Sequence, residues 1–152
     1  MREIFGNLWE VDADLRVITT NGDVDRFGAA VMGRGCAKEA RERVTGLEFH
    51  FGELLRCHGN RVMRLTKPRK GAALASFPVK HHWHESADPA LIQGSADQLL
   101  ALATKFGYRR VLIPRPGCGN GSLRWRDVRP ILTEVLDDRS AVITFAPKGP
   151  DG

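Results

Sequence analysis

The side chains best suited to chemistry in this chain are crowded into one stretch, SFPVKHHWHES, residues 76–86. An apolar run ends at Pro78 and a single amine, Lys80, follows it. Three imidazoles and an indole then come within four positions. An amine near other cations and partly out of water is a usable nucleophile or base, so Lys80 is a candidate catalytic residue. The alternative is a phosphate-binding or surface lysine.

The histidines of this stretch, His81, His82 and His84, first suggest a metal site. The H-H-x-H spacing is not typical of a tetrahedral zinc site, and no cysteine or carboxylate obviously completes one, so we expect no metal. His82 and Trp83 could instead contact a substrate, with the indole stacked on a flipped or single-stranded base. Trp83 packed against the sheet edge, with the histidines in solvent, is the other interpretation.

Two glycine-rich segments, AAVMGRGCAKEA (residues 29–40) and IPRPGCGNGSLRW (residues 113–125), each lie between a predicted strand and a predicted helix. Glycines let backbone N–H groups approach an anion closely, and a helix N-terminus adds partial positive charge. Together the two loops predict a diphosphate site. Neither contains G-x-x-x-x-G-K-[ST], and the acidic residue expected after a dinucleotide-binding glycine motif is missing, which argues against those two classes.

Strand-like and helix-like segments alternate along the chain, which predicts a three-layer α/β/α domain with a central mixed sheet. Ligands of such sheets bind at the carboxyl ends of the strands, where the glycine loops and Lys80 would meet. The predicted strands cover residues 3–11, 15–20, 61–67, 72–77, 109–114 and 140–146, and the predicted helices cover residues 35–44, 48–57, 88–106 and 125–136.

The bulk composition fits one domain, residues 1–147, followed by a frayed tail at residues 148–152. A net charge of +5 favours an anionic partner. Three widely spaced cysteines argue for reduced thiols. The sequence shows no signal peptide and no membrane span, so we expect a cytoplasmic protein, a monomer by default, with no cofactor.

Three motifs carry a resemblance to a known family. VMGRGCAKEA, SFPVKHHW and PGCGNGSLRWRDVRPIL occur in the order found in macrodomains, the ADP-ribose-binding α/β/α family. They are most similar to the branch of DNA ADP-ribosyl glycohydrolase antitoxins, DarG, whose motifs run V-M-G-K-G-I-A, N-F-P-T-K-x-H-W and G-C-G-N-G-G-L-x-W. A sister branch that acts on protein carboxylates carries an aspartate where this chain has Gly121, which favours a nucleobase-linked substrate.

The resemblance implies a role for each matching residue. Lys80 would act at the distal ribose, with Asn21 on the same sugar and His82 and Trp83 toward the substrate. Asn7 stands where macrodomains use an aspartate for adenine; its amide oxygen could still accept that bond, or it could cap a turn. The remaining ADP-ribose contacts implied are Leu8, Met32, Gly33, Arg34, Gly35, Cys36, Pro116, Gly117, Cys118, Gly119, Asn120, Gly121, Ser122 and Leu123. The loop after residue 20 is longer than is usual in this branch and could be a lid or a partner contact.

The function implied is removal of ADP-ribose from a nucleobase in DNA, so the expected partners are ADP-ribosylated substrates, including single-stranded DNA. The alternatives are a reader that binds ADP-ribose without cleaving it, and a hydrolase of protein-linked ADP-ribose or ADP-ribose-1″-phosphate.

Overall fold

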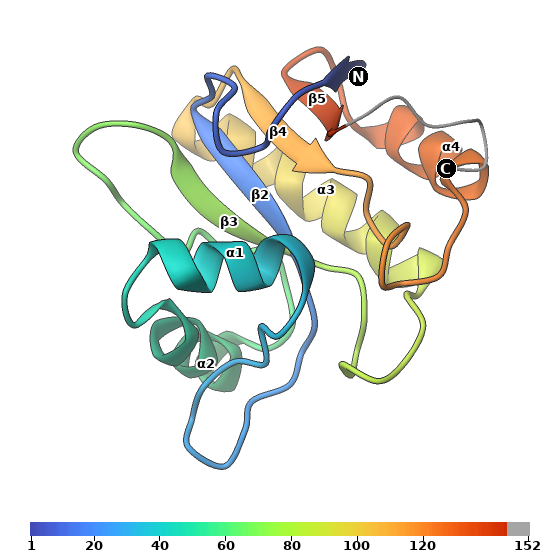
Figure 1. Cartoon of the computed structure of the whole chain (residues 1–152). Helices are drawn as coiled ribbons and strands as arrows, with labels where there is room; N and C mark the ends of the chain where they lie inside the picture. Colours follow the sequence, from blue (N-terminus) through green and yellow to red (C-terminus); the bar gives the residue numbers. More distant parts are fainter. Residues whose placement is uncertain (146–152) are drawn as a thin grey trace.

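A computed structural model describes residues 1–145 of the chain, which form a sheet covered by helices on both faces (Figure 1). The sheet has five strands in the order β1-β5-β4-β2-β3, and every neighbouring pair is parallel. The strands are β1 (Arg2–Phe5), β2 (Leu15–Thr20), β3 (Ala73–Pro78), β4 (Val111–Pro114) and β5 (Ser140–Thr144). The predicted tail, residues 148–152, lies outside the described residues, as does the last part of the predicted domain.

Two helices cover each face of the sheet. Helices α3 (Pro89–Phe106) and α4 (Trp125–Val135) pack on one face in a core with Phe77, Val111 and Leu132. Helices α1 (Gly35–Arg43) and α2 (Leu47–His58) cover the other face, where Ile18 and Phe51 are buried. The prediction of a three-layer α/β/α domain is confirmed. No helix within residues 1–145 is long and apolar enough to cross a membrane.

A mixed sheet was predicted, but the five strands are all parallel, and the antiparallel contact is an isolated bridge at one edge. Residues 61–67, predicted as a strand, form no regular strand and meet β3 through a single antiparallel bridge, Arg64 to Ala75. Two backbone hydrogen bonds form this contact, from Leu65 N–H to the Leu74 carbonyl oxygen (2.7 Å) and from Ser76 N–H to the Met63 carbonyl oxygen (2.9 Å), and hydroxyl groups take the neighbouring positions. Met63 N–H donates to Ser76 Oγ (3.0 Å) and Leu74 N–H donates to Thr66 Oγ1 (3.0 Å).

The predicted first strand, residues 3–11, is also shorter than expected. β1 ends at Phe5 because Asn7 starts a turn: its Oδ1 accepts from the Trp9 backbone N–H at 2.9 Å. The Asn7 carbonyl oxygen accepts from the N–H groups of Glu10 and Val11. The predicted bounds of α3 are closer to those in the structure, because a capping residue marks its start. Asp88 caps α3 by accepting from Ala90 N–H at 2.9 Å.

Candidate functional site

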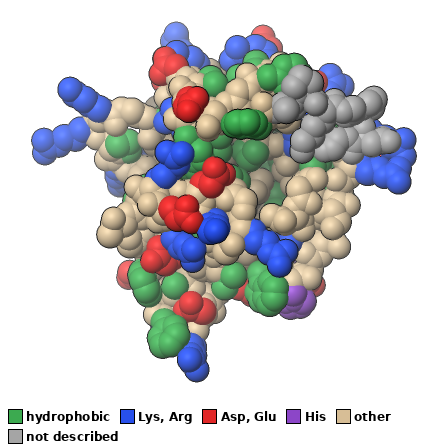
Figure 2. Space-filling model, in the orientation of Figure 1, with side chains coloured by type: hydrophobic (Ala, Val, Ile, Leu, Met, Phe, Trp, Pro, Cys, Tyr) green, Lys and Arg blue, Asp and Glu red, His purple; other side chains and the backbone are tan. Residues whose placement is uncertain are grey.

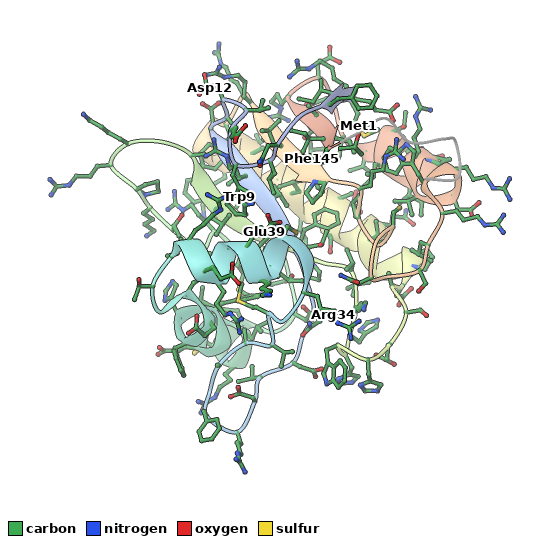
Figure 3. All side chains as sticks on the ribbon, viewed as in Figure 1. Met1, Trp9, Asp12, Arg34, Glu39 and Phe145 are labelled. Carbon is green, nitrogen blue, oxygen red and sulfur yellow. The ribbon has the colours of Figure 1, made fainter. Side chains whose placement is uncertain are left out.

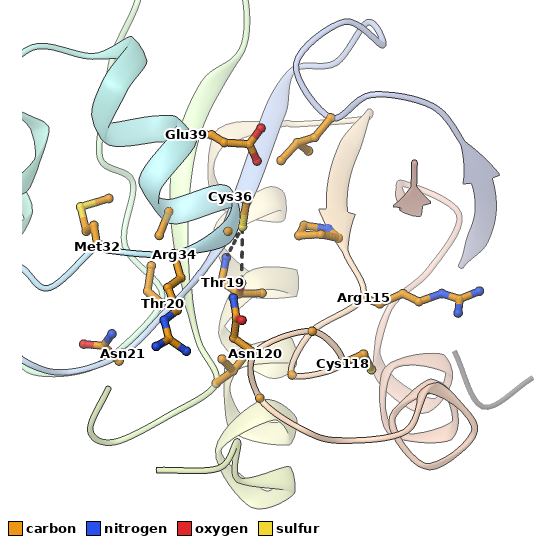
Figure 4. A pocket seen from close by; sticks show the side chains of 18 of the residues that line it. Thr19, Thr20, Asn21, Met32, Arg34, Cys36, Glu39, Arg115, Cys118 and Asn120 are labelled. Atoms are coloured by element: carbon orange, nitrogen blue, oxygen red, sulfur yellow. Dashed lines mark hydrogen bonds between the residues drawn. The ribbon is translucent and has the colours of Figure 1, made fainter. Parts of the chain in front are cut away.

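A cavity of about 690 Å³ opens at the carboxyl edge of the sheet (Figure 4). Its floor is formed where β2, β4 and β5 end, at Thr20, Pro114 and Thr144. Its walls are the two glycine-rich loops, the turn that begins at Lys80, and the segment after β1. The volume is within the range of small-molecule sites, and the position is the one expected for a ligand of a parallel sheet.

The first glycine loop places the start of α1 at the cavity. Arg34 is the N-cap residue of α1, and no side chain caps the helix. The first N–H groups of an α-helix have no partner within the helix, so those of Gly35 and Cys36 are available to an anion. Gly33, Arg34 and Gly35 are exposed, whereas Met32 is buried beneath them. This arrangement suits a phosphate group.

The second glycine loop is packed so closely that it needs glycine at two positions. Gly117 has φ +74°, and a Cβ at Gly121 would lie 2.7 Å from the Gly117 Cα and 2.8 Å from Ala87 Cβ. A Cβ at Gly35 would lie 3.5 Å from Asn120 Nδ2, so the two loops face each other at short range. The structure therefore brings the two glycine loops together at one cavity.

The turn after β3 brings Lys80 and Trp83 to the cavity. Lys80 Nζ donates to the Trp83 carbonyl oxygen at 3.2 Å, and Trp83 N–H donates to Asp23 Oδ2 at 2.7 Å. His82 Nδ1 lies 2.8 Å from Asp23 Oδ1. A hydrogen bond and the negative charge of Asp23 raise the pKa of His82. Desolvation opposes ionisation of Asp23, but the hydrogen bonds from His82 and Trp83 outweigh it, so the pKa of Asp23 is lowered.

The segment after β1 forms the far end of the cavity, with Leu8, Trp9 and the exposed ring of Phe145 (Figure 3). Arg16 holds this segment in place: its Nε donates to the Leu8 carbonyl oxygen at 2.8 Å and its Nη2 donates to the Val11 carbonyl oxygen at 3.0 Å. An aromatic ring beside apolar side chains suits a flat heterocycle.

Comparisons with known proteins find relatives of one name. No family model matches the sequence. DNA ADP-ribosyl glycohydrolase of Mycobacterium tuberculosis is 26% identical over 152 residues, which cover 95% of this chain and 41% of that protein. The Thermus aquaticus protein of the same name is 24% identical over 147 residues, 90% of this chain and 38% of that protein. The chain therefore spans about two fifths of the length of the curated relatives it matches.

Solved structures decide the fold. The macrodomain of Mycobacterium tuberculosis DarG superposes with a TM-score of 0.78 at 26% identity, over 94% of this chain and 97% of that one. Thermosipho africanus DarTG in complex with ADP-ribose gives a TM-score of 0.78 at 18% identity, over 99% of this chain and 44% of that one. The chain has the macrodomain fold.

Most of the residues predicted for ligand binding line the cavity of this macrodomain. Asn21 does so, although both ends of its amide are already engaged: Nδ2 donates to the Val31 carbonyl oxygen (3.1 Å) and Oδ1 accepts from Asp23 N–H (2.9 Å). The predicted residues that line the cavity are Asn7, Leu8, Asn21, Met32, Gly33, Arg34, Gly35, Cys36, Lys80, Trp83, Gly117, Cys118, Gly119, Asn120 and Gly121.

Four predicted residues do not line the cavity. Pro116 is buried, Ser122 is exposed with φ +67°, and Leu123 packs against the core. Each shapes the second loop; Leu123 N–H, for example, donates to the Gly117 carbonyl oxygen at 2.9 Å. His82 is held by Asp23 beside the cavity and not within its lining.

The macrodomain cavity also contains residues that the sequence did not single out. Thr20 lines the cavity although it is only 5% exposed, and its buried Oγ1 has no hydrogen-bond partner among the described residues. Thr19 also lines the cavity, and its N–H donates at 3.3 Å to Sγ of the predicted residue Cys36, whose thiol pKa is raised by burial (Figure 4). Glu39 adds a carboxylate from α1. The carboxyl-end rule applied to β2 would have found both threonines.

The histidine cluster does not assemble a metal site within residues 1–145. His81 Nε2 lies 2.8 Å from Asp88 Oδ2, and His82 Nδ1 lies 2.8 Å from Asp23 Oδ1. The two rings therefore contact different carboxylates. Of the two interpretations of Trp83, the structure shows an indole that is 54% exposed at the cavity mouth.

Proposed function

We propose that this macrodomain binds ADP-ribose and hydrolyses its bond to a nucleobase in DNA. The observation that carries the proposal is the meeting of two glycine loops and one amine, Lys80, around a single cavity. The relatives named DNA ADP-ribosyl glycohydrolase support the choice of DNA. The fit of each part of ADP-ribose to the cavity supports it further.

The diphosphate lies between the two glycine loops. The uncapped start of α1 at Gly35 and Cys36 supplies N–H donors and the positive end of the helix dipole. Asn120 faces this position from the second loop. Arg34 adds a charge at the rim, where its exposed guanidinium can reach phosphate oxygens.

The adenine ring lies at the far end, against Leu8 and Phe145. Asn7 Oδ1 already accepts one hydrogen bond from Trp9 N–H, and a carbonyl oxygen has a second lone pair for the adenine amino group. Recognition by a neutral amide is weaker than by a carboxylate. Apolar contact therefore makes the larger contribution to adenine binding here.

The distal ribose lies at the opposite end, where Lys80, Thr20 and Asn21 converge. Thr20 lies at this end of the cavity as part of its lining. Lys80 acts at C1″, where the bond to the nucleobase breaks, the base leaves, and the oxygen of a water molecule takes its place. The loops hold the diphosphate so that C1″ stays within reach of the amine.

The decisive experiment compares wild type with Lys80→Ala on an ADP-ribosylated single-stranded oligonucleotide. We expect Lys80→Ala to keep its affinity for ADP-ribose in calorimetry. The rate at which it releases ADP-ribose from the oligonucleotide should fall by at least about a hundredfold. Lys70→Ala, at an exposed site in the loop before β3, is the matched control and should behave as wild type. A wild type that binds ADP-ribose but leaves the oligonucleotide intact would instead identify a reader.

The substrate class is tested by running a glutamate-modified protein beside the oligonucleotide. Release from the oligonucleotide alone supports the proposal, whereas release from the protein alone identifies a protein-directed hydrolase. The closely packed second loop bears on this choice, because no carboxylate could occupy position 121 without displacing Gly117 and Ala87.

A further inference from the structure

The loop between β2 and α1 forms a closed hairpin, which we call the arm, residues 21–30 (Figure 1). Val24 and Ala30 form an antiparallel bridge, and Asp25 N–H donates to the Ala29 carbonyl oxygen at 2.8 Å. The Asp25 carboxylate accepts from the N–H groups of Phe27 (2.8 Å) and Ala29 (3.1 Å). These bonds fix the turn, so the orientation of its tip is set by the backbone.

The tip of the arm presents an aromatic ring and a cation to solvent. Phe27 is 71% exposed, and the Arg26 guanidinium carbon lies 4.8 Å from the centre of its ring. Trp83, at the cavity mouth, is also largely exposed, and its ring meets His84 edge-on at 5.6 Å. Figure 2 shows hydrophobic side chains at the lower edge of the molecule, with basic and acidic side chains among them.

Asp23 joins the arm to the turn that carries Trp83. Its two carboxylate oxygens bind the His82 ring and the Trp83 backbone N–H, and Gly22 N–H donates to the His81 carbonyl oxygen at 3.2 Å. The spacing between the two exposed rings is therefore fixed before any partner arrives. A preformed surface costs less conformational entropy on binding than one that must be ordered.

The arginines of this surface can bind a polyanion. The Asp23 carboxylate is engaged by His82 and by Trp83 N–H, and the exposed Asp25 carboxylate accepts from the N–H groups of Phe27 and Ala29. The exposed guanidinium of Arg26 faces outward beside Phe27, and Arg34 lies at the cavity rim. Aromatic rings interleaved with arginines are the pattern by which proteins bind single-stranded nucleic acid, with bases stacked on the rings and phosphates on the cations.

We propose that the arm and the Trp83 turn form a surface that binds single-stranded nucleic acid, and so guides the modified base into the cavity. Bases stack on Phe27 and Trp83, while Arg26 and Arg34 contact the phosphates between them. The inference rests on the proposed function for the identity of the strand, but the binding surface is testable without any turnover.

The test measures fluorescence anisotropy of a labelled, unmodified single strand of about 20 nucleotides. We expect Phe27→Leu to lower affinity about tenfold, since one stacked base is lost, and Phe27→Trp to retain it, since the ring is kept. Arg26→Ala should weaken binding and lower its salt dependence. Arg69→Ala, which removes an exposed arginine from the loop before β3, is the control for charge. ADP-ribose affinity should be unchanged in all four variants.

Wild-type affinity in Phe27→Leu, or equal losses in Phe27→Leu and Phe27→Trp, would overturn the proposal. So would equal binding of a matched duplex, whose bases are not free to stack. A pull-down in which Phe27→Leu keeps the oligonucleotide but loses a protein would assign the arm to a protein partner instead. If wild type binds the strand but releases no ADP-ribose from a modified one, the surface stands and the proposed reaction fails.

Discussion

At the scale of single residues, Gly121 shows how packing and chemistry act on one position. A Cβ there would meet the backbone of Gly117 and the Ala87 side chain at 2.5–2.8 Å, and backbone atoms cannot move aside cheaply. The glycine is thus required by the second loop itself. A mechanism that needs an acid at this position would need a different loop.

This gives a prediction with an internal control. Gly121→Ala should destabilise the fold by about 1–3 kcal/mol and weaken ADP-ribose binding, because the overpacked second loop must shift. Gly119→Ala, at a position with nothing within 4 Å of an added Cβ, should leave stability nearly unchanged. Thermal unfolding and calorimetry measure both effects. Equal stability of the two variants would mean that the second loop is not held by the contact between positions 117 and 121.

At the scale of elements, the predictable parts are those with local signals. Asp88-Pro89 and Gly107 mark α3 to within a residue, because an N-cap and a left-handed C-cap are written in neighbouring positions. Residues 61–67 look like a strand by composition, but Thr66 and Ser76 hydroxyls take the places of backbone partners. The sequence gives no local sign of that exchange.

The candidate site also has residues that local motifs predict and residues that they do not. The glycine loops and Lys80 could be predicted, because their motifs are contiguous and lie at strand ends. The contact from Asp23 to His82 and Trp83 could not be predicted, because it joins positions that are 59 and 60 residues apart. Glu39 was missed for a related reason: a charged residue at one helical position looks like a solvated face until the facing wall is known.

The junction between the arm and the Trp83 turn should depend on pH. The pKa of His82 is raised above its ordinary 6.5. Its contribution to the free energy of unfolding is therefore fully present below pH 6.5 and is lost as pH rises through the raised value. The pKa of Asp23 is lowered from 3.8, so its share is present above 3.8 and is lost as pH falls through the lowered value. Both contributions to stability are fully present between pH 3.8 and 6.5.

The groups that face His82 are Asp23 from the arm, Glu85, which accepts its backbone N–H, and the stacked ring of His84. We therefore expect the difference in unfolding temperature between wild type and His82→Ala to be largest inside that pH window and to shrink at alkaline pH. His81→Ala, which loses contact with Asp88 instead, is the comparison variant. A difference that stays constant through alkaline pH would show that His82 contributes no charged contact.

At the scale of the whole molecule, the net charge is +5, and basic side chains are scattered over the face shown in Figure 2. The cavity combines backbone donors and one helix start with the side chains of Lys80 and Arg34. Binding of a nucleic acid strand and binding of ADP-ribose should then respond differently to salt. Phosphate contacts release counterions, and a single strand loses affinity with a slope of about −0.7 per phosphate neutralised. Buried or partly buried contacts within the cavity are screened much less.

If the strand neutralises about three cations, raising monovalent salt from about 50 to 200 mM should weaken oligonucleotide binding by about 10–20-fold. ADP-ribose binding should weaken far less over the same range. Titrations of both ligands at each salt concentration give the two salt slopes. The difference between wild type and Arg26→Ala gives the part of the oligonucleotide slope that the arm contributes. Parallel slopes for the two ligands would mean that the cavity holds all of the charge contacts and that the strand gains nothing from the surface around it.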